Sequence, residues 1–535
     1  MRIILRVLLG WLSVIGLVGA LWARELPASN PVIRVAGGEI VGRMWEDGSG
    51  ATFRGIPYAR PPVGDLRWRE PMPVEPWKGQ RTAFEFAAAC AQVNGGWNAA
   101  AAQSGKEDCL YLNVDTPVLR PKALQPVMVW IHGGANAGGN TDELSSGKSL
   151  CRHGVVLVTI QYRLGLLGFM AHPELTQESP HHSSGDYGLL DQLAALKWVH
   201  ENIAQFGGDP NRITIFGQSA GSFDVGLLLA SPLSEGLFVG AIEQSGPAFS
   251  WRPTPSLTAA EAEGITVAEK LEAPKNGAIA FLRKIPAEEF IRNAQPPYGK
   301  GGATPNVDGY FLKADTATVY SNHSEQKLPL IVGSNGREFP GPKDPQELKL
   351  AVEKAFGKNS ERALAVYGLG ETPGPASDPR YGSTADQFTT DTMFRCGSVA
   401  TAMEHSVAAP TYQYEDTHPL PGAEANGAFH GAELGYLFGT LFMPETKAQF
   451  QRWGLNIGGL TDNDRTFSEL LQTYWTNFAK TGNPNGTSVP IWPAYNVEHK
   501  WYVEFTNNGP EVKNDLRGDV CRLLNSAESA GNRAH

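Results

Sequence analysis

A serine lies between two glycines at residues 217–221, which read Gly-Gln-Ser-Ala-Gly. The β-branched, apolar run at residues 213–216 predicts a buried strand before them, and the residues after Gly221 have the pattern of a helix. Glycines on both sides of a serine at a strand-to-helix turn allow a cramped backbone that exposes the hydroxyl, an arrangement called a nucleophile elbow. Ser219 is therefore a candidate nucleophile. The same pentapeptide also arises by chance in a chain with 60 glycines, so other residues must decide.

A serine nucleophile needs a base, and the base needs an anionic partner that fixes its tautomer. In chains with such an elbow the order is serine, acid, histidine. Among the 12 histidines, His430 lies downstream between small residues in Gly-Ala-Phe-His-Gly-Ala-Glu-Leu, and it is the predicted base. Glu338 follows an apolar strand predicted at residues 328–332 and is the predicted acid. Asp344 is the alternative acid.

Amide donors for a tetrahedral oxyanion are the third requirement of this chemistry. A strand predicted at residues 127–131 runs into the turn His-Gly-Gly-Ala at residues 132–135. Such donors commonly come from a glycine-rich turn together with the residue after the nucleophile. The predicted oxyanion hole consists of the backbone amides of Gly134, Ala135 and Ala220. Nucleophilic catalysis by these groups needs no cofactor.

Strands and helices alternate along the chain in the way that an α/β fold requires. A helix is predicted across residues 189–203, ending near Gly207. A hairpin is predicted at the N-terminal residues 32–41. Successive core strands are predicted at residues 127–131, 155–160, 213–216, 328–332 and 411–414.

Several separated segments carry a resemblance to a known family. They include Phe-Arg-Gly-Ile-Pro-Tyr-Ala at 53–59, Glu-Asp-Cys-Leu-Tyr-Leu-Asn-Val at 107–114, Tyr-Gly-Leu-Leu-Asp-Gln at 187–192 and Trp-Thr-Asn-Phe-Ala-Lys-Thr-Gly at 475–482. Together with the elbow they resemble the type-B carboxylesterase and cholinesterase family of the α/β-hydrolases. The resemblance implies an α/β-hydrolase fold, with a large, mostly parallel central sheet flanked by helices. It also implies a serine carboxylesterase acting on small to medium acyl or aryl esters. A lipase-like hydrolase and a non-catalytic binding module are the alternatives.

Three departures from the family pattern bear on substrate binding. The family usually has a third glycine and then an aromatic residue in the oxyanion turn, where this chain has Ala135 and Asn136, so we expect a more polar acyl pocket. Gln218 stands in place of the usual glutamate, which disfavours a cationic alcohol such as choline. Phe339 follows the acid in place of a glycine and is a candidate pocket wall. Asn136, Gln218 and Phe339 are thus the predicted substrate-binding residues.

The chain has five cysteines. By the same resemblance Cys90 pairs with Cys109, and Cys396 pairs with Cys521. Cys151 is then expected to be a buried free thiol. Neither Cys-x-x-Cys nor His-Glu-x-x-His spacing occurs, so no metal site is predicted.

The first residues have the pattern of an export signal. Arg2 and Arg6 precede an uncharged apolar run at residues 7–22, which is shorter than the roughly 20 residues that span a bilayer. Cleavage near Ala20 or Ala23 would remove a signal peptide of residues 1–23. Residues 24–535 would then form one secreted or periplasmic domain without stable membrane insertion. The net charge of −10 argues against a nucleic-acid partner, and a small-molecule ester is the predicted ligand.

Overall fold

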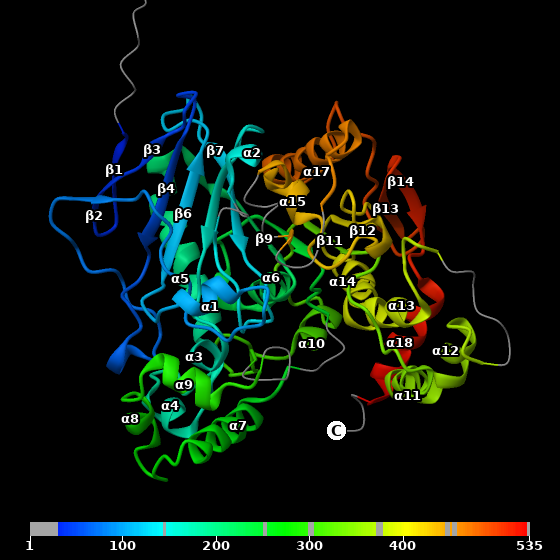
Figure 1. Cartoon of the computed structure of the whole chain (residues 1–535), viewed down its shortest axis with the longest axis horizontal. Coiled ribbons are helices and arrows are strands. Elements are labelled where there is room, and N and C mark those ends of the chain that lie inside the picture. The colour runs from blue at the N-terminus through cyan, green and yellow to red at the C-terminus, as the bar shows by residue number, and fades with distance from the viewer. Residues whose placement is uncertain are drawn as a thin grey trace, which may run out of the picture.

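An eleven-stranded mixed sheet runs through the protein in the computed structural model (Figure 1). This confirms the predicted α/β fold with a large central sheet flanked by helices. The predicted signal peptide at residues 1–23 lies outside the described residues. The structure describes residues 30–142, 146–249, 254–297, 304–370, 378–443, 450–451 and 457–531.

The middle of the sheet is parallel. Both of its faces are covered by other elements, so its strands are nearly continuous apolar runs. All five predicted core strands are present, although their ends differ by several residues, and two further strands, β10 and β13, were not predicted. In spatial order the parallel strands are β8 (Val156–Ile160), β7 (Gln125–Ile131), β9 (Gly208–Gln218), β10 (Gly240–Gln244), β11 (Leu330–Asn335), β12 (Thr411–Asp416) and β13 (Trp501–Thr506).

Antiparallel strands extend the sheet at both ends. β14 (Gly509–Asn514) pairs with β13 at one end. At the other end β6 (Tyr111–Thr116) pairs with β8 and is followed by β4 (Ala51–Pro57) and β3 (Arg43–Met44). The predicted N-terminal hairpin is also present, as β1 (Val32–Val35) and β2 (Gly38–Val41), and β5 (Gln80–Thr82) joins it in a small separate sheet.

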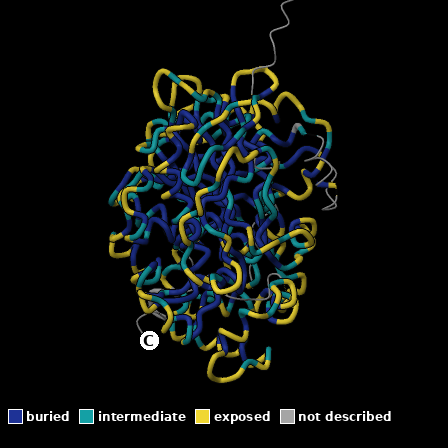
Figure 2. Tube along the Cα trace, turned by 90° about the vertical axis from the view of Figure 1, so that its left-hand side faces the viewer, coloured by how far each residue is buried: buried dark blue, intermediate teal, exposed yellow. Residues whose placement is uncertain are grey.

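Successive residues of a strand point to opposite faces of a sheet, and the core follows this rule. In β7, Val127, Val129 and Ile131 belong to one hydrophobic cluster, whereas Met128 and Trp130 belong to another. Figure 2 shows buried positions throughout the interior and exposed positions along the outer loops. The first cluster includes α5 (Tyr187–Asn202) and α6 (Ala220–Ala230), and the second includes α15 (Leu434–Leu437) and α17 (Asp462–Thr481).

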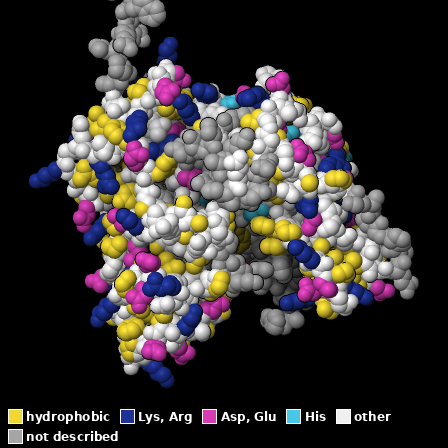
Figure 3. All heavy atoms as spheres, viewed as in Figure 1, with side chains coloured by type: hydrophobic (Ala, Val, Ile, Leu, Met, Phe, Trp, Pro, Cys, Tyr) yellow, Lys and Arg dark blue, Asp and Glu magenta, His cyan; other side chains and the backbone are white. Residues whose placement is uncertain are grey.

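Helix α5 confirms the helix predicted at residues 189–203. A 3₁₀ turn (Ile203–Phe206) follows it, and the chain leaves the helix at Gly207, whose φ of 83° is readily adopted only by glycine. No helix in the described ranges has the length and apolar character needed to cross a membrane. On the face drawn in Figure 3 both signs of charge are interspersed.

Two groups of helices lie below the sheet in the view of Figure 1, one around α7–α9 and one around α11, α12 and α18. The remaining helices are α1 (Ala99–Ser104), α2 (Lys148–Cys151), α3 (Gly165–Phe169), α4 (Pro173–Glu178), α7 (Leu257–Lys270), α8 (Ala278–Leu282), α9 (Ala287–Ala294), α10 (Thr316–Ser321), α11 (Pro345–Phe356), α12 (Ser360–Val366), α13 (Thr384–Thr390), α14 (Cys396–His405) and α18 (Gly518–Gly531).

Both expected disulfides are present. Cys90 is bonded to Cys109, and Cys396 at the start of α14 is bonded to Cys521 in α18. Cys151 is a buried free cysteine, and burial raises the pKa of its thiol well above the usual value. The second disulfide therefore ties the last helix to the body of the protein.

Replacing both Cys396 and Cys521 with alanine should lower the free energy of unfolding by about 3 to 5 kcal/mol, because the bond restricts a long loop in the unfolded chain. The two residues are 125 positions apart in the sequence. Urea unfolding of the wild type and the double variant, followed by circular dichroism, measures the difference. Cys151→Ala is the matched control, since it removes a buried cysteine that closes no loop. Equal stability of the double variant and the wild type would contradict the expectation.

Candidate active site

Ser219 lies at the turn between β9 and α6, with φ 59° and ψ −127°. This is a strained conformation for a residue with a side chain. The flanking glycines make the turn possible. A Cβ on Gly217 would lie 2.4 Å from the carbonyl group of Gly221, and a Cβ on Gly221 would lie 2.1 Å from the Ile131 carbonyl oxygen. The local geometry is thus that of a nucleophile elbow, and it leaves Ser219 partly exposed.

Glu338 and His430 are brought together from loops after β11 and β12. His430 Nδ1 lies 2.7 Å from Glu338 Oε2, and the His430 backbone N–H donates to the Glu338 carbonyl at 2.9 Å. An ionised carboxylate can only accept, so Nδ1 carries the proton and Nε2 is left as an acceptor. The Glu338 side chain is fully buried, whereas 13 % of the His430 side chain is exposed. The pair can therefore present a basic nitrogen.

Asp344, the alternative acid, has a different role. Its Oδ1 accepts hydrogen bonds from the backbone N–H groups of Gln346 and Glu347, so that it caps α11. A carboxylate in this position satisfies the free amides of a helix start. Of the two acids considered from the sequence, Glu338 is the one in contact with His430.

Asn335, at the end of β11, fixes the acid and the histidine loop together. Its backbone N–H donates to Glu338 Oε1 at 2.7 Å, and its side-chain amide donates to the Phe429 carbonyl at 2.7 Å. The Glu338 backbone N–H in turn donates to Thr390 Oγ1 at 3.0 Å. Glu338 Oε1 thus accepts from Asn335, and Oε2 contacts His430. The carboxylate is therefore held in one orientation against the ring.

Glu433 is a supporting residue that the sequence reasoning missed. It is buried, and its two oxygens accept from the side-chain amides of Asn335 at 2.8 Å and Gln244 at 3.1 Å. Burial, aided by the nearby charge of Glu338, raises the pKa of Glu433. In the sequence, the signal that could have indicated Glu433 was its position three residues after the predicted base, His430.

The predicted oxyanion turn after β7 lies directly against Ser219. A Cβ on Gly133 would be 2.9 Å from Ser219 Cβ, so only glycine fits there. Gly134 and Ala135 both have positive φ, of 113° and 55°. Among the described residues, no group accepts a hydrogen bond from the backbone N–H of Gly134, Ala135 or Ala220. The three predicted donors are thus available to a ligand.

Asn136 does not form the polar pocket wall that its type suggested. Its side chain is buried, with Nδ2 donating to Asp224 Oδ1 at 2.8 Å and Oδ1 lying 3.1 Å from the Tyr162 hydroxyl. The amide N–H of Asn136 is therefore bonded within the protein, and its side-chain oxygen lies beside the Tyr162 hydroxyl. Asn136 has a φ of 51°, a conformation that asparagine tolerates better than most residues. Through these contacts Asn136 supports the predicted oxyanion turn.

The other two predicted pocket residues lie beside His430. Gln218 Nε2 lies 3.1 Å from His430 Nε2 and donates to it. The ring of Phe339, which is 39 % exposed, has its centroid 4.4 Å from that of His430. Phe394 lies 4.9 Å away and belongs to a π-helical turn (Asp391–Arg395), a feature often found at functional sites.

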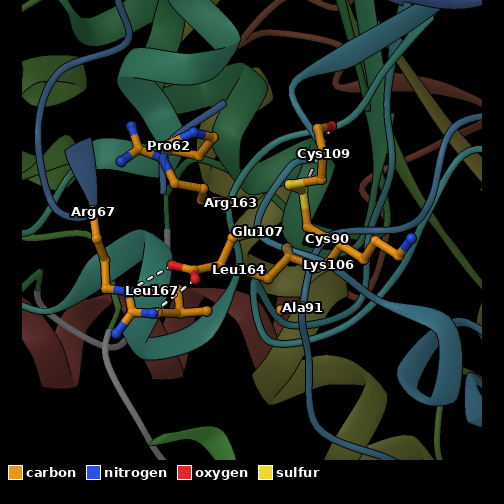
Figure 4. A pocket seen from close by; sticks show the side chains of 10 residues that line it. All are labelled: Pro62, Arg67, Cys90, Ala91, Lys106, Glu107, Cys109, Arg163, Leu164 and Leu167. Carbon is orange, nitrogen blue, oxygen red and sulfur yellow. Dashed lines mark hydrogen bonds and ion pairs between the residues drawn. A yellow bond between two sulfur atoms is a disulfide. The ribbon is translucent and has the colours of Figure 1, made fainter. Parts of the chain in front are cut away.

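A separate pocket beside the first disulfide has a structural character. Figure 4 shows Arg67 and Glu107 facing each other there, joined by two hydrogen bonds of 2.6 and 2.7 Å. The enclosed volume is about 10 Å³, which is room for about one water molecule.

In the described part of the chain, no group of three or more His, Cys, Asp or Glu side chains could hold a metal ion.

The comparisons with known proteins show the family of the chain. The pattern that defines the carboxylesterase family matches residues 29–524. The chain belongs to this family. The carboxylesterase is similar to the fumonisin B1 esterase of Sphingopyxis macrogoltabida, with 37% identity over 460 residues that cover 84% of this chain and 82% of that protein. It is also similar to the cocaine esterase of Homo sapiens, with 34% identity over 515 residues that cover 89% of this chain and 88% of that protein.

Solved structures agree with the sequence comparison. A PNB esterase superposes with a TM-score of 0.78 and 31% identity, over 93% of the carboxylesterase and 99% of that chain. The carboxylesterase is accordingly an α/β-hydrolase that acts on carboxylic esters.

Replacing Gln218 with glutamate should move the acid limb of kcat/KM to higher pH by about one unit, because a carboxylate close to His430 Nε2 favours the protonated ring. The wild-type amide lies 3.1 Å from this nitrogen and carries no charge. The pH dependence of p-nitrophenyl acetate hydrolysis measures the shift. Gln346→Glu, on the exposed side of α11, adds the same charge at a distance and should leave the limb unmoved. Superimposable profiles for Gln218→Glu and the wild type would refute the interpretation.

Proposed function

We propose that the carboxylesterase hydrolyses its ester through an acyl-enzyme formed on Ser219, with His430 as the base and Glu338 as its partner. The observation that carries this proposal is the 2.7 Å contact between His430 Nδ1 and Glu338 Oε2, since it leaves Nε2 as a proton acceptor. The strained elbow supports it, because it holds a serine hydroxyl clear of the sheet at the start of α6.

In the first half of the reaction, His430 Nε2 removes the proton of Ser219 as its oxygen attacks the ester carbonyl. Negative charge then develops on the carbonyl oxygen, and the amides of Gly134, Ala135 and Ala220 are the donors that stabilise it. His430 next gives its proton to the leaving alcohol, which leaves an acyl ester on Ser219. In the second half, water loses a proton to His430 and attacks this ester. His430 then returns the proton to the Ser219 oxygen as the acid is released.

Gln218 takes part in the opening step. Its amide donates to the nitrogen that must accept the serine proton, at 3.1 Å. This bond has to yield when the Ser219 hydroxyl donates to His430. Gln218 thereby keeps the ring in its orientation between turnovers, without placing a second negative charge next to it.

The proposed substrates are uncharged small to medium acyl or aryl esters. Phe339 offers exposed apolar surface next to His430, and the buried Phe394 also contacts the ring. Gln218 gives no anion that would attract a cationic alcohol. The relatives are named for chemically different compounds, fumonisin B1 and cocaine. The family likeness therefore supports the ester class, and the surface around His430 supports an apolar group beside the scissile bond.

We also propose that residues 1–23 are removed on export and that residues 24–535 form the secreted or periplasmic domain. The two disulfides support this assignment, because such bonds persist in oxidising compartments.

Ser219→Ala should lower kcat for p-nitrophenyl acetate by at least about 10⁴-fold, since the nucleophile is lost and only the oxyanion donors and binding remain. Stoichiometric labelling by an organophosphate provides a second measurement, with one label per wild-type chain and none on Ser219→Ala. Ser222→Ala removes a nearby buried hydroxyl that donates to the Gly246 carbonyl, and this control should still be labelled. Substantial turnover by a folded Ser219→Ala protein would end the proposal.

Glu338→Gln should lower kcat by about 10⁴-fold, because a neutral amide can donate to Nδ1 and stabilise the tautomer that has no basic Nε2. The fold should persist, as the two side chains have the same shape. Asp344→Asn is the matched control at the alternative acid, and we expect its kcat to stay within about twofold of the wild type, since the capping oxygen is kept. Equal losses in the two variants would argue against a special role for Glu338.

A further inference from the structure

Asp224 lies inside α6, one turn after the nucleophile, and none of it is exposed. Its Oδ1 accepts from Asn136 Nδ2 at 2.8 Å, and its Oδ2 accepts from Gln192 Nε2 at 2.6 Å. One carboxyl group thus connects the oxyanion turn to both α5 and α6. The proposed chemistry gives no role to this group.

The oxyanion turn needs such a support. Ala135 and Asn136 both have positive φ, and strained backbone of this kind persists only where the surroundings hold it. Two further contacts help. The Gly165 backbone N–H donates to the Asn136 carbonyl at 2.6 Å, and the Tyr162 hydroxyl donates to the His132 carbonyl at 2.6 Å. Of these contacts, the bond from Asn136 to Asp224 is the one that involves a carboxyl group.

We propose that Asp224 is a positioning residue for the oxyanion hole, which acts through Asn136 and holds the turn most firmly when it is ionised. The inference rests on the proposed function, because it assumes that the amides of Gly134 and Ala135 stabilise the oxyanion.

The hydrogen bonds explain why ionisation matters. Both partners of Asp224 donate an N–H, and only a carboxylate accepts at both oxygens without a proton of its own to place. Protonated Asp224 needs an acceptor, and Gln192 Oε1 is buried without a partner among the described residues. A half turn of the Gln192 amide would bring this oxygen to Asp224. The bond from Asn136 would then be a neutral one, which is roughly half as strong as a charge-assisted one.

The two forms exchange near neutral pH. Burial raises the pKa of Asp224 to about 7, against the effect of its two hydrogen bonds. Ionised Asp224 therefore predominates above this pH, and the firm hold on the turn is lost as the pH falls through it.

Other ionisable groups lie on the elements packed against α6. Burial lowers the pKa of His132 to about 4, well below that of Asp224. Burial raises the pKa of Glu243 to about 8, so this group also titrates in the tested range, and the Glu243→Gln variant separates its effect from that of Asp224. Asp186, at the start of α5, has its pKa raised well above the usual range by burial. The remaining groups are Tyr320 on α10, which stays protonated, and the ion pair of Arg163 with Asp191.

Asp224→Asn tests the proposal, because it keeps the shape and both hydrogen-bonding positions but cannot ionise. We expect kcat for p-nitrophenyl acetate to fall about tenfold at pH 8.5, with KM within about twofold, since a displaced oxyanion donor weakens transition-state binding alone. The ratio of wild-type to variant kcat should rise from about one or two below pH 6 to about ten above pH 8. This ratio isolates Asp224, because the ionisation of His430 is common to both proteins.

Asn136→Gly completes a double-mutant cycle, since glycine adopts the positive φ while the side chain is removed. We expect Asp224→Asn to have no further effect on kcat in the Asn136→Gly background, as the two residues act through one contact. Glu243→Gln is the control, because it removes another buried carboxyl group. Its kcat should equal that of the wild type, and the ratio of wild-type to Glu243→Gln kcat should not change with pH. Thermal unfolding of each variant records any loss of stability separately.

A ratio that is flat across pH, or losses that multiply in the double variant, would overturn the role of Asp224. These outcomes leave the proposed function intact as long as Ser219→Ala is inactive. Persistent activity of Ser219→Ala would instead remove the proposed function, on which the inference depends.

Discussion

Backbone segments at the carboxyl edge of the sheet approach one another too closely for side chains, and the active site depends on this contact. A Cβ on Gly221 would lie 2.1 Å from the Ile131 carbonyl oxygen, and a Cβ on Gly246 would lie 1.9 Å from the Ser219 carbonyl oxygen. The ends of β7, β9 and β10 are thereby joined into one support. Because the proposed oxyanion turn continues β7 and Ser219 follows β9, the same contact sets the distance between them. A site on a rigid scaffold keeps the geometry that catalysis requires.

Three buried acid groups, Glu338, Glu433 and Asp416, interact electrostatically, and Glu338 is the one that contacts the His430 ring. Glu338 is fixed by Asn335, whose backbone N–H donates to its other oxygen. Burial raises the pKa of Glu433, and it raises that of Asp416 well above its usual value. In both cases burial disfavours the charged form of the acid.

Sequence patterns predicted the parts of the site that follow local rules. Ser219 was found from glycines within two positions of it, and His430 and Glu338 from chain order and a preceding strand. Contacts between distant residues were not accessible in the same way. Asp224 lies 88 residues from Asn136, so nothing near Asn136 indicated that its amide would be bonded inside the protein. Likewise β10, the short run Gly240–Gln244, was not predicted, although both of its neighbours in the sheet were.

The residues around His430 bear on which esters the proposed base can act on. Phe339 and Phe394 contact its ring, and Gln218 occupies its Nε2, so that only 13 % of the side chain is exposed. The bond from Gln218 shields Nε2 of the proposed base from water. Exclusion of water strengthens electrostatic interactions inside a site, so the proposed oxyanion donors would gain from an ester that covers this surface. The two aromatic rings and the neutral Gln218 amide favour an uncharged group beside His430.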